Sequence, residues 1–328
     1  MRTPVQVLDK KEPLRLYVRQ RQLLALLDVL GGNAGNRDFQ KLLFLCCKEL
    51  FPTDQTSPYE FVPYQYGAFS FTCYADRRRL VDCGLLIDDP QHWALTEKGK
   101  CIARETQDDS MRVFAQRYRR LRGDALIAET YRKYPYYAIH SDIAGQVLEN
   151  DEAALSRIES ARPEGTPSRL LTIGYEGRTL ESYLNALLQA SVTVLCDVRR
   201  NAISRKYGFS KNTLAKACNG VGIRYEHLPE LGIESRQRQG LESQADFDAL
   251  FRTYERKSLP RQGDALAKIC AWLRLGESVA LTCYERDADQ CHRHCVADAL
   301  CQILDQKDLF DQAASHHTAE QGCTVKHL

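Results

Sequence analysis

Residues 169–198 read RLLTIGYEGRTLESYLNALLQASVTVLCDV. The stretch holds two almost wholly apolar segments, 169–174 and 192–198, and between them residues 179–190 carry leucine at helical spacing. Strands that read as continuous apolar runs are typical of parallel sheets whose two faces are covered by helices. Strand, helix and strand in this order therefore predict one repeat of an α/β fold.

The rest of the C-terminal half continues this alternation. A short strand is expected at 223–227 and a last buried strand, SVALTC, at 278–283. Helices are expected at 214–219, 247–257, 263–275 and 291–304. The predicted fold class is α/β, with an open, mostly parallel C-terminal sheet and helices on both faces. In such sheets ligands bind outside the carboxyl ends of the strands.

The N-terminal part has a different pattern, which is mainly helical. Helices are expected at 15–30, at 38–50 with Asp38 as the N-terminal cap, and at 70–83, followed by a hairpin with strands at 85–87 and 92–95. This order is typical of a winged-helix-like domain. The predicted domains are a winged-helix-like domain over 1–108, a helical connector and linker over 109–165, the α/β domain over 166–305 and a polar tail over 306–328.

Three short motifs of the N-terminal part resemble the winged-helix proteins of the SocA and Panacea antitoxin type. They are Lys41-Leu42-Leu43-Phe44-Leu45, Tyr66-Gly67-Ala68-Phe69-Ser70 and Gly84-Leu85-Leu86. The resemblance implies docking onto a partner, either a protein or DNA, and a setting in phage defence or genome maintenance. For DNA, Arg77-Arg78-Arg79 lies on the third helix, where such folds place the helix that reads the groove.

Composition excludes several classes of protein. The 328 residues carry 45 Lys and Arg against 43 Asp and Glu, so the net charge of +2 excludes a uniformly polybasic protein. No apolar run reaches the roughly 20 residues that span a bilayer, and the first twenty residues lack a secretory apolar stretch. The odd count of 13 cysteines favours reduced thiols. We therefore predict a cytoplasmic protein with no membrane partner.

Polar residues follow the predicted strands where an α/β sheet binds its ligands. Tyr175 and Glu176 follow the first strand and His227 ends a third, while the second is followed by a group comprising Asp197, Arg199, Arg205 and Lys206. Residues 199–261 hold thirteen Lys and Arg against seven Asp and Glu, which favours a polyanionic partner. We expect an anion site at which the arginines point to solvent. Asp197, paired with an arginine, would be a base or would orient that arginine.

The last strand leads into a segment rich in cysteine and histidine. Cys283 ends the strand, and Cys291-His292-Arg293-His294-Cys295 opens the closing helix. A thiol at a helix N-terminus beside His292 and Arg293 is expected to have a lowered pKa, which would make Cys291 a nucleophile with His292 as its partner and Arg293 as an anion ligand. Metal binding by Cys283, Cys291, His294 and Cys295 is the second interpretation, and packing of these thiols in the core is the third. Sulfur transfer is disfavoured because the loop YERDADQ, residues 284–290, is acidic and lacks glycine.

Residues 169–303 resemble the bacterial and archaeal family catalogued as domain of unknown function 488. The pieces that carry the resemblance are Thr172–Gly177, Asp197-Val198-Arg199, Ser204-Arg205-Lys206, Gly208-Phe209-Ser210, His227–Gly232, Leu281–Glu285 and Cys291-His292-Arg293. The resemblance implies an open α/β sheet of rhodanese size and leaves the activity unassigned. The chain departs from the family pattern at His294-Cys295.

Two hypotheses about function follow from these observations. The first is a protein that binds nucleic acid or a nucleotide in a crevice lined by arginine, cysteine and histidine, and that as an enzyme would act on DNA. The alternative is a non-catalytic regulator or adaptor that senses a small anion and binds a protein through its N-terminal domain. The sequence does not identify a cofactor. A nucleic-acid complex should weaken steeply as salt rises, and an adaptor should show no such binding.

Overall fold

The computed structural model describes residues 15–51, 57–164, 169–314 and 325–328. The chain divides into two compact units. One contains the described residues up to Tyr59 together with Cys73–Gly123, and the other contains Glu60–Thr72 together with the described residues from Asp124 onward. No helix in these ranges combines the length and the apolarity that a bilayer crossing requires.

The first unit is helical, as the sequence predicts. Its helices are α1 (Val18–Val29), α2 (Asn36–Leu50), most of α3 (Phe71–Asp82), α4 (Glu97–Arg104) and α5 (Asp109–Arg117).

One local prediction for this unit is wrong, and another is confirmed in part. Gly35, not Asp38, is the N-cap of α2, and Asp38 lies in the first turn, where its charge still suits the helix dipole. The expected antiparallel pairing is present as a bridge between Leu86 and Leu95, with the Ile87 N–H donating to the Ala94 carbonyl at 2.8 Å, and β4 (His92–Ala94) also pairs antiparallel with β1 (Asn33–Gly35). The additional partner of β4 is β1, which has only three residues and therefore shows no strand pattern in the sequence.

The second unit begins with a hairpin that is distant in sequence from its sheet. Strands β2 (Val62–Tyr64) and β3 (Gly67–Phe69) pair antiparallel, and the Asn185 side-chain amide of α9 (Leu180–Gln189) donates to the Phe61 carbonyl at 2.7 Å. The buried Glu181 carboxylate of α9 accepts hydrogen bonds from Ser70 Oγ at 2.9 Å and the Thr72 backbone N–H at 2.7 Å. The hairpin is thereby fastened to α9.

Residues 111–134, a basic stretch within the expected helical connector, are divided between two helices. Gly123, with a φ of +55°, begins α6 (Gly123–Lys133), which follows α5 after a break. Most of the basic groups of this run are used internally, for example in ion pairs of Arg117 with Glu49 and of Arg132 with Asp151. Short segments η1 (Pro135–Ala138), α7 (Ala144–Val147) and α8 (Glu152–Ser160) complete the connector.

The sheet of the second unit is parallel throughout, which confirms the predicted fold class. Its strands lie in the order β7-β6-β8-β5-β9. They are β5 (Leu170–Gly174), β6 (Val194–Asp197), β7 (Arg224–His227), β8 (Val279–Cys283) and β9 (Val325–His327). Every described residue of β5, β6 and β8 is buried. The edge strand β9 lies in a segment that the sequence predicts to be a polar tail.

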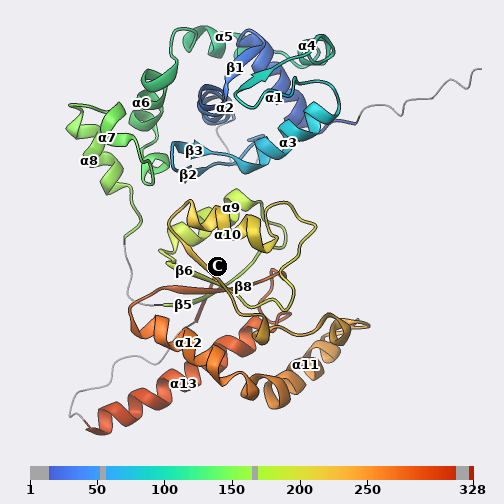
Figure 1. Ribbon diagram of the computed structural model, residues 1–328, viewed down its shortest axis with the longest axis vertical. Helices are drawn as coiled ribbons and strands as arrows, with labels where there is room; N and C mark the ends of the chain where they lie inside the picture. Colours follow the sequence, from blue (N-terminus) through green and yellow to red (C-terminus); the bar gives the residue numbers. More distant parts are fainter. Residues whose placement is uncertain (1–14, 52–56, 165–168, 315–324) are drawn as a thin grey trace, which may run out of the picture. The chain divides into compact units, whose positions relative to one another are not determined.

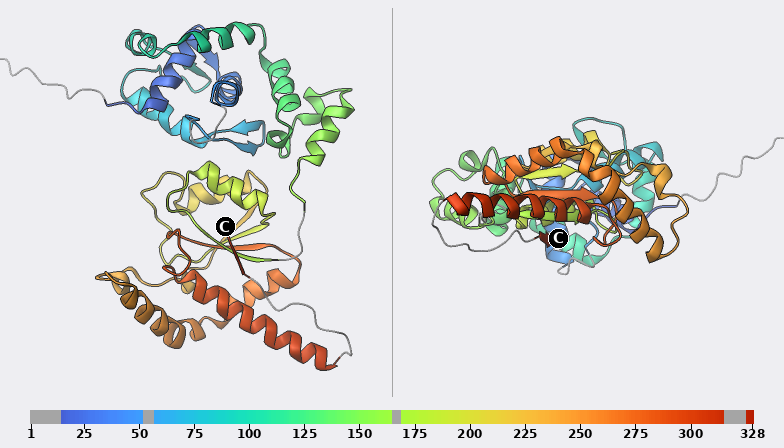
Figure 2. Two further views of the ribbon diagram at one scale, coloured as in Figure 1. Left: turned by 180° about the vertical axis from the view of Figure 1, so that it is seen from behind. Right: turned by 90° about the horizontal axis from the view of Figure 1, so that it is seen from below.

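Helices cover both faces of this sheet. Figure 1 and Figure 2 show α9 and α10 (Lys211–Asn219) on one face, and α11 (Gln244–Thr253), α12 (Gly263–Arg274) and α13 (Arg293–Ala314) on the other. The two faces have separate hydrophobic cores. The helices that follow β5 and β6 lie on one face and the helix that follows β8 lies on the opposite face, so the loops diverge at the carboxyl ends of these neighbouring strands. A crevice of this kind is where open α/β sheets bind ligands.

Candidate functional site

A buried ion pair closes the carboxyl end of β6. Arg199 Nε donates to Asp197 Oδ1 at 2.8 Å and Arg199 Nη2 donates to Oδ2 at 2.5 Å, while the Tyr225 hydroxyl donates to Oδ2 at 2.6 Å. Arg199 is only 5% exposed, so the expectation that it points to solvent is wrong. Burial alone would lower the pKa of Arg199, but the hydrogen bonds and charge of Asp197 raise it above its ordinary value. The pairing expected for Asp197 is present, and its carboxylate holds the arginine in place.

The same guanidinium organises the aromatic residues behind the crevice. Arg199 Nη1 donates to the Tyr175 hydroxyl and to the Phe209 carbonyl, both at 2.9 Å. The Tyr175 and Phe209 rings are stacked with centroids 4.4 Å apart, and Tyr175 is buried. Tyr175 is therefore unavailable to stack on a ligand. One exposed ring at this edge belongs to Tyr284, which contacts Tyr175 edge-on at 5.3 Å and is 45% exposed.

Unlike Arg199, the other cations of the loop between β6 and α10 face solvent. Arg200, Arg205 and Lys211 are exposed, and Lys206 is half-buried. Lys206 Nζ donates to the Tyr175 carbonyl at 2.9 Å, and burial lowers the pKa of this lysine. In the described part of the chain, no carboxylate lies within salt-bridge distance of any of these four groups.

Two further residues predicted for the anion site have structural contacts. His227 Nε2 lies 2.8 Å from the Arg199 carbonyl, which ties the end of β7 to the loop after β6. Glu176 is exposed, and its Oε2 accepts a hydrogen bond from the Arg286 backbone N–H at 3.0 Å. Both residues connect loops at the carboxyl edge, and the negative charge of Glu176 limits how close a phosphate can come on that side.

Two thiols and an imidazole form a buried group at the end of β8. The sulfur atoms of Cys283 and Cys291 each lie 3.9 Å from His292 Nδ1. His292 Nε2 lies 3.0 Å from the Val198 carbonyl, which cannot donate, so Nε2 carries a proton and Nδ1 faces both sulfurs. Cys291 and His292 are neighbours in the sequence, whereas Cys283 reaches the same imidazole only in the folded chain.

The electrostatics of this group correct the prediction about which thiol ionises. The hydrogen bond from Cys291 and the charge of His292 lower the pKa of Cys283 well below its ordinary value. Burial raises the pKa of Cys291 well above it. Burial by itself would lower the pKa of His292, but the adjacent Cys283 thiolate raises it. These opposite directions favour Cys283 over Cys291 as the thiol that ionises more readily.

Arg293 stabilises the loop after β8 from inside. It is 1% exposed, and its Nη1 and Nη2 donate to the backbone carbonyls of Glu285 and Arg286 at 2.5 and 3.0 Å. The Glu285 carboxylate forms an ion pair with Arg238 from η3 (Ser235–Arg238), and burial raises the pKa of Glu285. The predicted role of Arg293 as an exposed anion ligand does not agree with this placement.

The residues predicted as one alternative metal site fall into two groups. Within the described residues, Cys283 and Cys291 cluster with His292, whereas His294 and Cys295 cluster with Glu255. Glu255 was not identified from the sequence, because it lies 39 positions before His294 and reaches it only through the packing of η4 (Tyr254–Ser258) against α13.

Comparison with known proteins supports the resemblance of the C-terminal part. Residues 179–300 match the model of a family described as Domain of unknown function DUF488. The matched region runs from the start of α9 into α13 and contains the ion pair, the cationic loop and the buried thiols. No curated protein and no solved structure matches the chain. The resemblance of the N-terminal part to SocA and Panacea proteins is not confirmed.

Proposed function

We propose that the second unit binds a nucleic acid or a nucleotide through its phosphate groups at the loop between β6 and α10. One observation carries the proposal: Arg200, Arg205, Lys206 and Lys211 lie within twelve consecutive residues at a strand carboxyl end, and among the described residues none of the four forms a salt bridge, although the charge of Glu176 acts on Lys206. Exposed cations that no acid neutralises are the groups that bind phosphate.

The internal contacts of the loop support a preformed site. Arg199 is held by Asp197, and Ser210 Oγ donates to the Ser204 carbonyl at 3.0 Å and accepts from the Ser204 N–H at 3.1 Å. These bonds fix the backbone on both sides of Arg205 and Lys206. A phosphate would then meet cations whose positions are already constrained, which reduces the entropy lost on binding.

Exposed aromatic rings favour a ligand that carries a base as well as phosphate. Tyr207 is 39% exposed and lies on the cationic loop, and the exposed Tyr284 contacts Tyr175, whose carbonyl accepts from Lys206. Bases stack on such rings without regard to sequence.

Binding is tested by fluorescence anisotropy with a labelled single strand and a labelled duplex over a series of salt concentrations. Each phosphate contact contributes about 0.9 to the logarithmic salt slope for a duplex and about 0.7 for a single strand, so four cations predict a slope of roughly −3 to −4. Arg205→Glu with Lys206→Glu should weaken binding and reduce the slope by about 1.5 to 2.

The matched control is a double variant of two other cations in the same basic segment, Arg256→Glu with Lys257→Glu. Both side chains are exposed on η4, and the change in net charge is the same. Equal weakening by the two double variants would refute the loop as the site. Absence of nucleic-acid binding together with retained binding of inorganic pyrophosphate would instead support a regulator that senses a small anion.

A further inference from the structure

Three ligand-type side chains converge on the helical face of the sheet opposite to α9. Glu255 comes from η4, a π-helical turn that follows α11, and His294 and Cys295 come from the first turn of α13. One donor atom of each, a carboxylate oxygen, an imidazole nitrogen and a sulfur, lies within 4.8 Å of the others. π-helical turns are rare and frequently occur at functional sites.

The imidazole of His294 is held in the tautomer that a metal requires. Its Nδ1 lies 2.7 Å from the Cys291 carbonyl and 3.1 Å from the Ala288 carbonyl, so Nδ1 carries the proton. Nε2 therefore carries the lone pair, and it accepts a hydrogen bond from Cys295 Sγ, which lies 3.3 Å away. Metal-binding histidines commonly donate the other ring N–H to a backbone carbonyl in this way. The Phe251 ring, edge-on to the imidazole at 5.1 Å, further restricts its orientation.

The distance between nitrogen and sulfur suits a tetrahedral zinc ion. Zinc bonds of about 2.1 Å to nitrogen and about 2.3 Å to sulfur place the two atoms about 3.6 Å apart at a tetrahedral angle. The 3.3 Å between His294 Nε2 and Cys295 Sγ requires an adjustment of only a few tenths of an ångström. Burial and the neighbouring Glu255 carboxylate both raise the pKa of Cys295. A bound dication would instead lower the pKa of this thiol and favour the thiolate.

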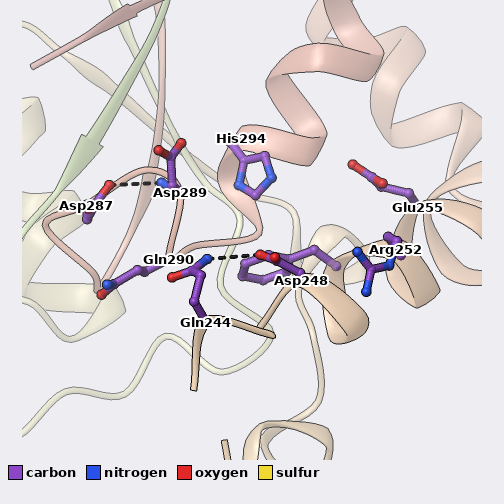
Figure 3. A pocket seen from close by; sticks show the side chains of 9 residues that line it. Gln244, Asp248, Arg252, Glu255, Asp287, Asp289, Gln290 and His294 are labelled. Atoms are coloured by element: carbon purple, nitrogen blue, oxygen red, sulfur yellow. Dashed lines mark hydrogen bonds between the residues drawn. The ribbon is translucent and has the colours of Figure 1, made fainter. Parts of the chain in front are cut away.

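Two pockets border this cluster: one of about 590 Å³ is lined by Glu255 and His294, and one of about 360 Å³ is lined by Glu255 and Cys295. Figure 3 shows His294 between Glu255 on one side of the larger pocket and Asp287 and Asp289 on the other. Four carboxylates line it, the fourth being Asp248, and Arg252 is its one basic lining residue apart from the histidine. The excess of negative charge concentrates cations at the cluster.

We propose that His294 Nε2, Cys295 Sγ and the Glu255 carboxylate bind zinc or another thiophilic divalent cation, with a fourth coordination position open to the larger pocket. The proposal is independent of phosphate binding at the loop after β6. It also distinguishes this cluster from the group of Cys283, Cys291 and His292, in which the Cys283 thiolate already has cationic partners in His292 and Arg238. An open position is typical of zinc sites that act on a ligand, whereas structural sites have four protein ligands.

The test is titration of the full-length, metal-stripped protein with Co²⁺, in which a cobalt–thiolate bond produces a charge-transfer absorption. One equivalent of Co²⁺ should produce this band, and Zn²⁺ should displace it. Cys295→Ser should abolish the band. His294→Gln should weaken Co²⁺ affinity by at least about tenfold, since loss of even an outer-shell partner costs that much.

Two further variants keep the test decisive. Because Cys295 is buried and its substitution could disturb folding, the exposed Glu255→Gln is the second ligand variant, and it should weaken Co²⁺ affinity about tenfold with an unchanged circular dichroism spectrum. Cys283→Ser is the matched thiol control and should keep the band. Loss of the band in Cys283→Ser, or its persistence in Cys295→Ser, would overturn the proposal and assign the metal to the other cluster.

Discussion

Removal of Arg199 should destabilise the second unit strongly, although the sequence alone predicts an exposed side chain there. Arg199→Ala leaves the fully buried Asp197 carboxylate with the Tyr225 hydroxyl and the Arg199 backbone N–H as its remaining donors. It also removes the donor that the Tyr175 hydroxyl and the Phe209 carbonyl share. Breaking a buried ion pair by removing one partner costs about 3–5 kcal/mol. With a urea dependence of about 2 kcal/mol per molar, the midpoint should fall by roughly 1.5–2.5 M.

The chain provides a local probe for this measurement. Of its two tryptophans, Trp272 lies on α12 in the core of the second unit and Trp93 lies on β4 in the first. Urea unfolding followed by tryptophan fluorescence in a Trp93→Phe background therefore reports the unit that contains Arg199. The exposed neighbour Arg205 supplies the control, since Arg205→Ala should change the free energy of unfolding by no more than about 0.5 kcal/mol.

A double variant separates loss of the pair from loss of packing. Asp197→Ala with Arg199→Ala removes both charges, so it should be less destabilising than the sum of the two single variants. A midpoint for Arg199→Ala within about 0.3 M of the wild type would refute the reasoning, because it would correspond to well under 1 kcal/mol. Additive effects in the double variant would show that the two charges do not stabilise each other.

Two further predictions concern the loop after β8. In the wild type the ultraviolet absorbance of the Cys283 thiolate should disappear only when the pH falls through a pKa well below the ordinary range. His292→Asn removes a cation beside this sulfur, so the pKa should rise and the absorbance should disappear at a higher pH. Identical pH titrations of the variant and the wild type would contradict the assignment of the thiolate to Cys283. Gly174→Ala should destabilise the second unit by about 1–3 kcal/mol, because a Cβ at this position would lie 1.8 Å from the Glu285 carbonyl oxygen. The control is Gly263→Ala, whose Cβ would meet open space at the first turn of α12. Urea unfolding should show that this control is neutral or stabilising.

The parallel sheet could be predicted because a strand that is buried on both faces has apolar residues at consecutive positions. The strands at 170–174, 194–197 and 279–283 are apolar at nearly every position, and an apolar run bounded by turns specifies a buried strand without reference to the rest of the chain. The edge strand β9 has no such apolar run. It has three residues, of which only Val325 is apolar, and it exists because β5 offers it an unpaired edge.

The chemistry was less predictable because partners that are distant in sequence decide it. Cys291 and His292 are adjacent in sequence, yet Cys283 has the lowered pKa, since the fold brings its sulfur from the end of β8 to the Cys291 thiol and to the imidazole. Arg199 and Asp197 are two positions apart at a strand end, a spacing that places both side chains on one side of the chain. That spacing agrees with the pairing that the sequence predicts for Asp197, whereas nothing local connects Glu255 with His294.

The hairpin that is hydrogen-bonded to α9 affects how this protein folds during synthesis and where it can be cut into fragments. Residues 60–72 belong to the second unit but are flanked in sequence by parts of the first, so the chain passes between the units three times. During synthesis the hairpin leaves the ribosome about a hundred residues before Glu181, and it must wait for that helix before it is fastened. A fragment that starts after Gly123 would expose the surface that Val62 covers, so the α/β unit should be expressed with residues 60–72 supplied, either in the whole chain or as a graft.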